Sequence, residues 1–434
     1  MTSSILVINA GSSSIKFQLI EVGSERVTRS GFVDRIGQEL SAVRQVSSEG
    51  TVDREVKVRD HGEAMSIVLG DFEDSGASLR DPDLVAVGHR VVMGGRDLDR
   101  PVAIDDAVLA RIEELSPLAP LHNPANAKAI RVTRKLLPQV PQVAVFDTAF
   151  FHDLPPEASS YAIDPALAER HSIRRYGFHG ISHEYVSRTV AEMLSAAGHS
   201  NGDSGSARGG PGNGDPGSAR GGDGTSHGSA GTADGLRQIV LHLGNGASAS
   251  AVVNGRAVDV SMGFTPLEGL VMGTRSGDID PSVAFYLNRQ ADMSIDDIDH
   301  LLNQRSGMLG LTGHIDLRDV HRSVAAGDRA AQLGLDMYVG RLRKYIGAYA
   351  AAMGGLDALT FTAGVGENDS KVRSQTVDRL GFLGITIDPT LNNLDSADPR
   401  VISDAGSRVK VLVVPTREEL SIARQVADLI RPIN

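Results

Sequence analysis

This sequence of 434 residues contains no cysteine. It therefore has no disulfide framework, no thiolate metal site and no thiol nucleophile. It also lacks any apolar run near the roughly 20 residues that cross a bilayer. Its start, MTSSILVINA, has neither the basic region nor the apolar core of a secretory signal. These absences predict a cytoplasmic protein without a membrane partner.

Positive charge is also in short supply. Lys and Arg number 43 against 54 Asp and Glu, which gives a formal net charge of −11. A nucleic-acid-binding protein usually carries a basic face, so we expect no nucleic-acid partner. If the substrates are anions, the site must gather positive charge locally against this background. The length favours two domains rather than one core.

Short apolar runs alternate with stretches of helical periodicity through most of the chain. The runs suit buried strands, and they lie at 84–92, 140–147, 237–244, 358–364 and 409–416. The helical stretches lie at 164–173, 183–198 and 329–355. This alternation predicts an α/β fold, with functional residues at the strand ends.

The segment 198–235 breaks this pattern. It contains no Val, Ile, Leu, Met or aromatic residue, and the hexapeptide GSARGG occurs in it twice. A segment without apolar side chains cannot offset its ordering entropy. We therefore predict a disordered Gly/Ser-rich insertion at about 198–235, with a lid or partner-binding tail as the alternative.

Two segments share one design of strand, small-residue turn and strand. They are VINAGSSSIKFQLI at 7–20 and HLGNGASASAVVNG at 242–255. The likeness favours a duplicated domain over two unrelated hairpins. Small-residue turns allow backbone N–H groups to converge on a phosphate, and Lys16 is placed to reach one of its oxygens. With AGVGEN at 363–368 as a third glycine turn, the sequence predicts a nucleotide held across a cleft.

Arg90, Asp147 and Glu418 stand at or near the ends of apolar runs, whereas His179 lies in RRYGFHGISH and Arg275 in TPLEGLVMGTRSGDIDP. Each has a structural alternative. Arg90 suits a structural ion pair, and His179 suits a hydrogen-bonded core histidine. Asp147 suits a helix N-cap, and Glu418 an acid at a helix start. The alternatives do not explain why so many apolar strands end in charge.

Ten short motifs together resemble the acetate kinase (acetokinase) family over nearly the whole chain. In order they are NAGSSSIK, GHRVVMGG, HNPAN, FDTAF, YGFHGISH, HLGNGAS, TPLEGLVMGTRSGDIDPS, DLRD, AGVGEN and PTREE. The resemblance implies membership of the superfamily of acetate and sugar kinases, heat-shock chaperones and actin. It implies two ribonuclease-H-like, actin-like ATPase domains around a nucleotide cleft. The expected boundaries are 1–150 plus about 417–434 for one domain and 151–416 for the other.

The resemblance also implies the activity. The expected reaction is reversible, direct in-line transfer from ATP to acetate, giving ADP and acetyl phosphate. It requires Mg²⁺, with Mn²⁺ as a substitute, and a homodimer is expected. A kinase of the same fold that prefers propionate or butyrate is the close alternative. A chaperone or filament ATPase is the alternative from another class.

Carried over by motif, the resemblance implies a role for each site residue. The catalytic positions are Asp147, His179, Arg275 and Arg90, of which Arg90 also binds acetate. The methyl pocket would comprise Val92, Leu121, Phe178 and Pro266, and the metal positions are Asn9 and Glu418. The nucleotide positions are Lys16, His242, Leu243, Gly244, Asn245, Gly246, Asp316, Leu317, Arg318, Gly364, Val365, Gly366, Glu367 and Asn368.

The chemistry of the acceptor refines one of these roles. A carboxylic acid with a pKa of about 4 to 5 is ionised at neutral pH and needs no general base. It needs cations that relieve its repulsion from the phosphoryl group. We therefore expect Asp147 to orient an arginine or the metal. Met93 and Phe151 stand where many members of the family have histidine, which leaves the preferred acid open.

Overall fold

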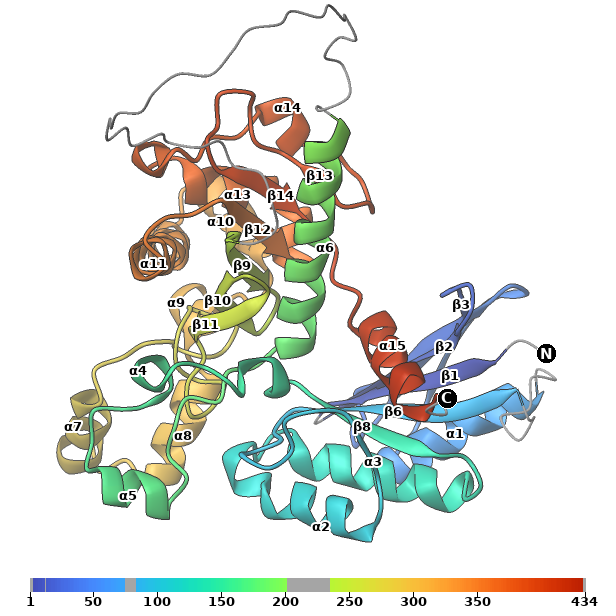
Figure 1. Ribbon diagram of the computed structural model, residues 1–434. Helices are drawn as coiled ribbons and strands as arrows, with labels where there is room; N and C mark the ends of the chain where they lie inside the picture. The colour runs from blue at the N-terminus through green and yellow to red at the C-terminus, as the bar shows by residue number, and fades with distance from the viewer. Residues whose placement is uncertain (1–2, 12, 75–82, 201–234, 432–434) are drawn as a thin grey trace, which may run out of the picture.

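The computed structural model of this chain describes residues 3–11, 13–74, 83–200 and 235–431. Two β-sheets form the centres of two lobes, and the chain crosses from the first lobe to the second and back (Figure 1). Both described ends of the chain lie in the first lobe. Most of the expected insertion at 198–235 falls on residues 201–234, which lie outside the described residues.

The first sheet has the strand order β5-β4-β3-β2-β1-β6-β8-β7. Its strands are β1 (Ser4–Ala10), β2 (Ser14–Glu21), β3 (Val27–Asp34), β4 (Ser41–Ser47), β5 (Gly50–Val56), β6 (Leu84–Val91), β7 (Val102–Ala103) and β8 (Gln142–Phe146). Strands β1 to β5 form an antiparallel meander, whereas β1, β6 and β8 are parallel.

The second sheet repeats this arrangement in the order β11-β10-β9-β12-β14-β13. Its strands are β9 (Arg237–Leu243), β10 (Ala247–Val253), β11 (Arg256–Val260), β12 (Ala358–Thr362), β13 (Arg400–Val401) and β14 (Lys410–Val413). Strands β9 to β11 are antiparallel, whereas β9, β12 and β14 are parallel. The order β3-β2-β1-β6-β8 thus matches β11-β10-β9-β12-β14, which confirms the predicted α/β fold with duplicated halves.

Helices cover both sheets. In the first half they are α1 (His61–Asp74), α2 (Asp106–Glu114), η1 (Ser116–Leu118), α3 (Asn123–Leu136), η2 (Ala149–Phe151), α4 (Pro156–Ser159), α5 (Pro165–Arg170) and α6 (Gly180–Ser200). In the second half they are α7 (Ser282–Gln290), α8 (Ile295–Gln304), α9 (Gly307–Thr312), α10 (Leu317–Ala325), α11 (Arg329–Ala352), α12 (Ala363–Asn368), α13 (Ser370–Val377), η3 (Gly381–Leu383), α14 (Pro389–Asn392) and α15 (Glu418–Ile430). No helix among the described residues is long and apolar enough to cross a membrane.

The two halves exchange their last helices. Helix α15 follows the second sheet but packs on the first, where Ile422 and Val426 belong to one buried cluster with the β1 side chains Ile5 and Val7. The opposite face of β1 packs against α1 and α3. Helix α6 follows the first sheet but packs on the second, through Val186 and Val190. As a result, the segments that lead into α6 and α15 both cross between the lobes (Figure 1).

The structure confirms the strands that the apolar runs predict, but it corrects one predicted turn. The runs at 84–92, 140–147, 237–244, 358–364 and 409–416 contain β6, β8, β9, β12 and β14. The AGVGEN segment is not a glycine turn, however, because Ala363–Asn368 forms the short helix α12 directly after β12. Its backbone begins in the left-handed region, with φ of 64° at Ala363.

Candidate active site

A cavity of about 240 Å³ lies between the lobes at the carboxyl ends of the central strands. The first half of the chain contributes Asn9, Ala10, Gly11, Ser14, Lys16, Arg90, Val92, His122 and Asp147 to its lining. Residues further along the chain contribute Phe178, His179, Gly246, Pro266 and Arg275. Ten of the residues predicted for the site, from both halves of the chain, therefore border one cleft.

The strand register brings the first-lobe residues together. Lys16 lies directly opposite Asn9 in the β1–β2 hairpin. Arg90 is on β6, which is parallel to both β1 and β8, and Asp147 follows β8. Because parallel strands end at the same edge of a sheet, Asn9, Arg90 and Asp147 converge there.

Two asparagines of the HNPAN motif hydrogen-bond to the backbone at these strand ends. Sequence reasoning gave them no role. Asn126 accepts a hydrogen bond from the Val92 N–H at 3.2 Å and donates to the Ala10 carbonyl at 2.6 Å. Asn123 accepts from the Met93 N–H at 3.0 Å and donates back to its carbonyl at 3.1 Å. Helix α3 thereby ties the ends of β1 and β6 to each other.

Arg90 and Asp147 form a buried, forked ion pair. The Nε and Nη2 groups of Arg90 donate to both carboxylate oxygens of Asp147 at 2.7 to 3.1 Å, and the Asp147 side chain is 2% exposed. Burial raises the pKa of Asp147, and the Arg90 guanidinium opposes that rise. Burial alone would lower the pKa of Arg90, but Asp147 and Glu418 raise it. Arg90 is therefore a fixed cation in the cleft.

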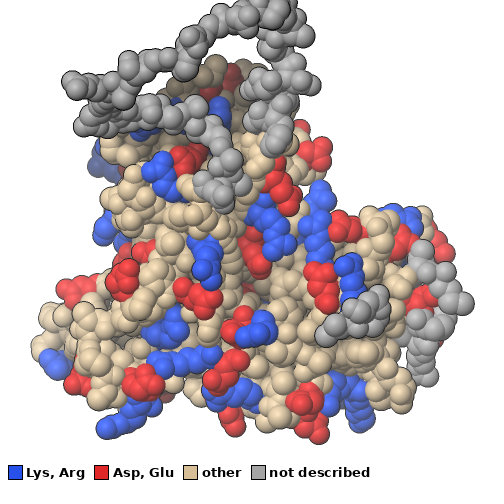
Figure 2. Space-filling model, viewed as in Figure 1, with Lys and Arg blue, Asp and Glu red and all other residues tan. Residues whose placement is uncertain are grey.

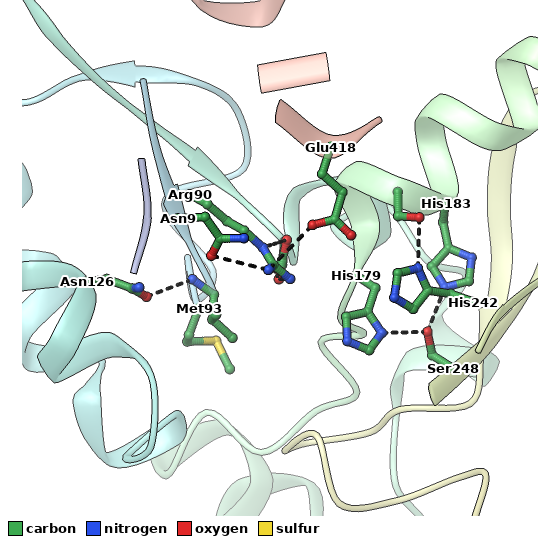
Figure 3. A network of polar contacts seen from close by, with 12 residues as sticks. Asn9, Arg90, Met93, Asn126, His179, His183, His242, Ser248 and Glu418 are labelled. Atoms are coloured by element: carbon green, nitrogen blue, oxygen red, sulfur yellow. Dashed lines mark hydrogen bonds and ion pairs between the residues drawn. The ribbon is translucent and has the colours of Figure 1, made fainter. Parts of the chain in front are cut away.

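Two oxygens converge on the opposite edge of the Arg90 guanidinium. Asn9 Oδ1 and Glu418 Oε2 each lie 3.4 Å from Nη1 of Arg90 (Figure 3). Burial would raise the pKa of Glu418, but Arg90, His242 and Lys16 together lower it, so the carboxylate is ionised. No cluster of three or more His, Cys, Asp or Glu residues suited to a metal occurs within the described ranges. A single carboxylate beside an amide oxygen fits Mg²⁺, which protein sites commonly hold through one or two carboxylates, substrate phosphates and water.

His179 stands on a constrained backbone just before α6. Its φ is 60°, in the left-handed region that L side chains rarely adopt. The next residue must be glycine, because a Cβ at Gly180 would lie 2.2 Å from the Asp147 carbonyl oxygen. The ring of His179 stacks on that of His242 with centroids 4.3 Å apart. Burial, followed by the neighbouring His242 and Arg90, holds the pKa of His179 well below its usual value, so the ring is neutral.

Arg275 is the second cation of the cleft. Its Nη1 donates to the Pro266 carbonyl at 2.7 Å, and none of the described carboxylates forms an ion pair with it. Burial lowers its pKa to about 10, so it remains charged at neutral pH. A Cβ at Gly246 would lie 2.7 Å from Nη2 of Arg275 and 3.3 Å from Nε2 of His179. Both side chains therefore approach the small-residue turn between β9 and β10.

The lining of the pocket includes one residue that sequence reasoning missed and leaves out one that it predicted. His122 lines the cleft, and burial, followed by Arg275 and Arg90, lowers its pKa to about 4. The neighbouring residue Leu121, predicted for the methyl pocket, is 42% exposed and is not part of the lining. His122 is the first residue of the HNPAN motif, and this position in a family motif was the signal that could have identified it as a site residue.

Several predicted nucleotide positions do not line this cavity. Of the segment from His242 to Gly246 only Gly246 lines it, and the ranges 316–318 and 364–368 do not. Asp316 caps α10, and its carboxylate pairs with Arg318 at 2.5 Å. The two outer ranges are connected, because His321 of α10 contacts Asp369 at 2.8 Å just after α12.

The cleft thus concentrates hydrogen-bond donors and positive charge in an acidic protein. Arg90 and Arg275 supply fixed charge, and neutral His179 and His122 supply ring nitrogens. On the face shown in Figure 2, by contrast, Lys and Arg side chains are interspersed with Asp and Glu. Such a cleft suits small anions that must be held close to one another.

Comparison with known proteins assigns the chain to a family. The model of the acetokinase family matches residues 4–208 and 229–424. An acetate kinase of Leifsonia xyli is 50% identical over 428 residues, which cover 99% of both chains. An acetate kinase of Streptomyces griseus is 48% identical over 430 residues, covering 98% of this chain and 96% of the relative.

Solved structures agree with that assignment. An acetate kinase from Porphyromonas gingivalis has a TM-score of 0.84 at 39% identity, covering 99% of this chain and 100% of the other. A propionate kinase from Francisella tularensis also has a TM-score of 0.84, at 36% identity and 98% coverage of both chains. The fold is therefore common to kinases named for acetate and for propionate.

Proposed function

The chain belongs to the acetokinase family, and its activity is that of an acetate kinase, a phosphotransferase with a carboxyl acceptor; we propose that it transfers the γ-phosphoryl group of ATP directly to acetate. ADP and acetyl phosphate are the products, and the reaction is reversible. The observation that carries this proposal is the placement of Arg90, His179 and Arg275 around one cavity.

In the proposed step, a carboxylate oxygen of acetate forms a bond to the γ-phosphorus. The bond from that phosphorus to the β,γ-bridging oxygen breaks, and ADP leaves. The acetate oxygen carries no proton, so no base is required. Arg90 binds the acetate carboxylate, while Arg275 and His179 donate to the oxygens of the transferring group, where the transition state concentrates charge. Asp147 holds the Arg90 guanidinium in place through its forked hydrogen bonds.

Mg²⁺ is the proposed cofactor, and Mn²⁺ its proposed substitute. Asn9 and Glu418 would hold the ion, partly through water, together with the nucleotide phosphates. When bound, the ion neutralises charge on the phosphate oxygens. Lys16, the turn from His242 to Gly246 and the ranges 316–318 and 364–368 would contact the nucleotide.

We expect the wall of the cavity to favour the shortest acid. Val92, Phe178 and Pro266 line it, and they offer an apolar surface for a methyl group beside Arg90. One added methylene changes discrimination by about 1–3 kcal/mol. We therefore expect kcat/KM for acetate to exceed that for propionate by about tenfold or more.

The test is an acyl phosphate assay with hydroxylamine trapping across acetate, propionate and butyrate. Product should form with Mg²⁺ and ATP and disappear when the metal is chelated. A higher kcat/KM for propionate or butyrate would instead assign the chain to a longer-chain carboxylate kinase. ATP hydrolysis without acyl phosphate would contradict both and favour an ATPase of another class.

A homodimer through α7 and α8 is proposed as the assembly. These helices expose apolar side chains, with Phe285 55%, Tyr286 66% and Ile295 67% exposed. An interface would remove these apolar side chains from water. Phe285→Glu should shift the sedimentation coefficient from dimer to monomer, whereas Phe382→Glu, at a 79% exposed site in η3, should leave it unchanged. A wild-type monomer would refute the assembly.

The domain boundaries and the location are also proposals. The packing of α15 on the first sheet supports a first domain of 1–150 plus about 417–434, with 151–416 as the second. A cytoplasmic location is supported by the composition and by the use of ATP.

A further inference from the structure

A chain of four polar side chains leads from the buried interior to His179. Ser250 Oγ lies 2.8 Å from Nδ1 of His183, and Nε2 of His183 lies 2.7 Å from Ser248 Oγ. Ser248 Oγ in turn lies 2.9 Å from Nδ1 of His179 (Figure 3). Both serines and His183 are 0% exposed. Of these four hydrogen-bonded side chains, only His179 lines the cleft.

Because Ser248 hydrogen-bonds to both imidazoles, the position of the proton on one ring depends on its position on the other. A serine hydroxyl has one proton to donate, and a neutral imidazole has one donor and one acceptor nitrogen. Ser248 Oγ could accept from both rings, but its own proton would then have no acceptor among the described residues, because the two rings are its only side-chain partners there. Two arrangements use the Ser248 proton: all donors point towards the cleft or all point away from it. These arrangements place the proton of His179 on Nε2 and on Nδ1, respectively.

The substrate distinguishes between the two arrangements. Nε2 of His179 faces the turn at Gly246, where Nη2 of Arg275 also points. The oxygens of a phosphoryl group only accept hydrogen bonds, so an Nε2 lone pair directed at them would be repulsive. Only the arrangement that directs every donor towards the cleft allows His179 to bind that group.

We propose that Ser248 is a positioning residue that fixes His179 as the neutral imidazole with its proton on Nε2. The hydroxyl of Ser248 donates to Nδ1 of His179 while accepting from Nε2 of His183, and Ser250 donates to Nδ1 of His183. His179 thereby becomes a hydrogen-bond donor of fixed direction without carrying charge. This role rests on the proposed phosphoryl transfer.

The surroundings keep both rings neutral, as the arrangement requires. Burial, followed by His242, lowers the pKa of His183 well below its usual value. The pKa of His179 is also lowered well below its usual value. Which nitrogen of an imidazole carries the proton is set by the hydrogen bond at the other nitrogen. Ser248 is the group that makes this bond to His179.

Kinetics on two variants test the role. Ser248→Ala should lower kcat by about 10- to 100-fold, as when the hydrogen-bond partner that orients a metal-binding histidine is removed, while KM for acetate and for ATP changes little. Ser248→Thr, which keeps the hydroxyl, should recover most of the lost kcat. Ser403→Ala is the matched control, because Ser403 is a buried hydroxyl without a hydrogen-bond partner in the described part of the chain. It should retain wild-type kcat.

Nitrogen-15 NMR of the histidine rings gives a readout that structural damage would not reproduce. In the wild-type protein with Mg²⁺ and ATP, the proton of His179 should be on Nε2, with Nδ1 bare. Ser248→Ala should give a mixture of the two tautomers. His179→Gln assigns the signals.

Two results would overturn the proposal. One is a proton on Nδ1 of His179 in the wild-type protein with Mg²⁺ and ATP. The other is a Ser248→Ala variant with wild-type kcat. If the wild-type protein forms no acyl phosphate, the proposed function fails, whereas the NMR measurement still decides the tautomer.

Discussion

Replacing Arg275 with alanine should lower kcat by about 10²- to 10³-fold, the usual loss when one preorganised donor to a transition state is removed. Arg275 has no carboxylate partner among the described residues, and its hydrogen bond to the Pro266 carbonyl aims it into the cleft. Its charge therefore remains available to the transferring phosphoryl group. Steady-state kinetics in both directions of the reaction measure the loss.

The same substitution should leave the protein as stable as before. Burial lowers the pKa of Arg275 to about 10, so below that pH the folded state holds a charge that it disfavours. Alanine removes this charge and one hydrogen bond, worth about 1 kcal/mol, so Tm should not fall appreciably. Arg275→Lys keeps the charge without the forked geometry and should be intermediate in kcat. A fully active Arg275→Ala variant would remove this residue from the mechanism.

Most of the fold was predictable because its signals are local. Buried parallel strands appear as unbroken apolar runs, and β6, β8, β9, β12 and β14 were identified in this way. The two small-residue hairpins also predicted the duplicated domain. The exchange of α6 and α15 between lobes was expected only through the family resemblance, which implied the domain boundaries. The sequences of the two helices do not show it, because a helix with an apolar face can pack on either sheet.

The candidate site was predicted less completely, since its details depend on contacts between distant segments. Motifs pointed to Arg90, Asp147 and Arg275, and the chemistry of the acceptor predicted that Asp147 orients an arginine or the metal. The sequence did not show that this arginine is Arg90. For Arg90 the structural alternative is also true, since the same guanidinium is in an ion pair and in the cleft. AGVGEN was predicted as a turn because glycine is common in turns, yet it forms α12.

Leu121 and His122 show a second limit. Adjacent residues on a non-helical segment point in different directions, and only the backbone decides which one enters the pocket. Here His122 lines the cleft and Leu121 is exposed. Ser248 shows a third limit, because its importance lies in joining two histidines that are 4 residues apart in sequence. A spacing in the sequence does not reveal which hydroxyl lies between them.

The remaining large effect concerns Asp147, the partner of Arg90. Asp147→Asn removes the negative charge that the Arg90 guanidinium contacts at 2.7 Å, and leaves Glu418 at 3.4 Å as its nearest acid. Breaking a buried ion pair from one side lowers the free energy of unfolding by about 3–5 kcal/mol. Arg90 should then move towards Asn9 and Glu418, the proposed metal positions. We therefore expect lower stability, a higher Mg²⁺ requirement and a kcat at least tenfold lower, because displaced positioning groups cost about this much or more.

Three measurements separate this orienting role from proton abstraction. Chemical denaturation gives the stability change, and Asp53→Asn is the control, because Asp53 forms a similar forked pair with Arg44 at an exposed site. That control should retain wild-type stability and kinetics. Titration with Mg²⁺ should show the altered requirement in Asp147→Asn alone. The pH dependence of kcat should keep its shape in this variant, because an ionised acetate needs no base. A variant that kept full stability but lost the acidic limb of its pH profile would instead make Asp147 a proton acceptor.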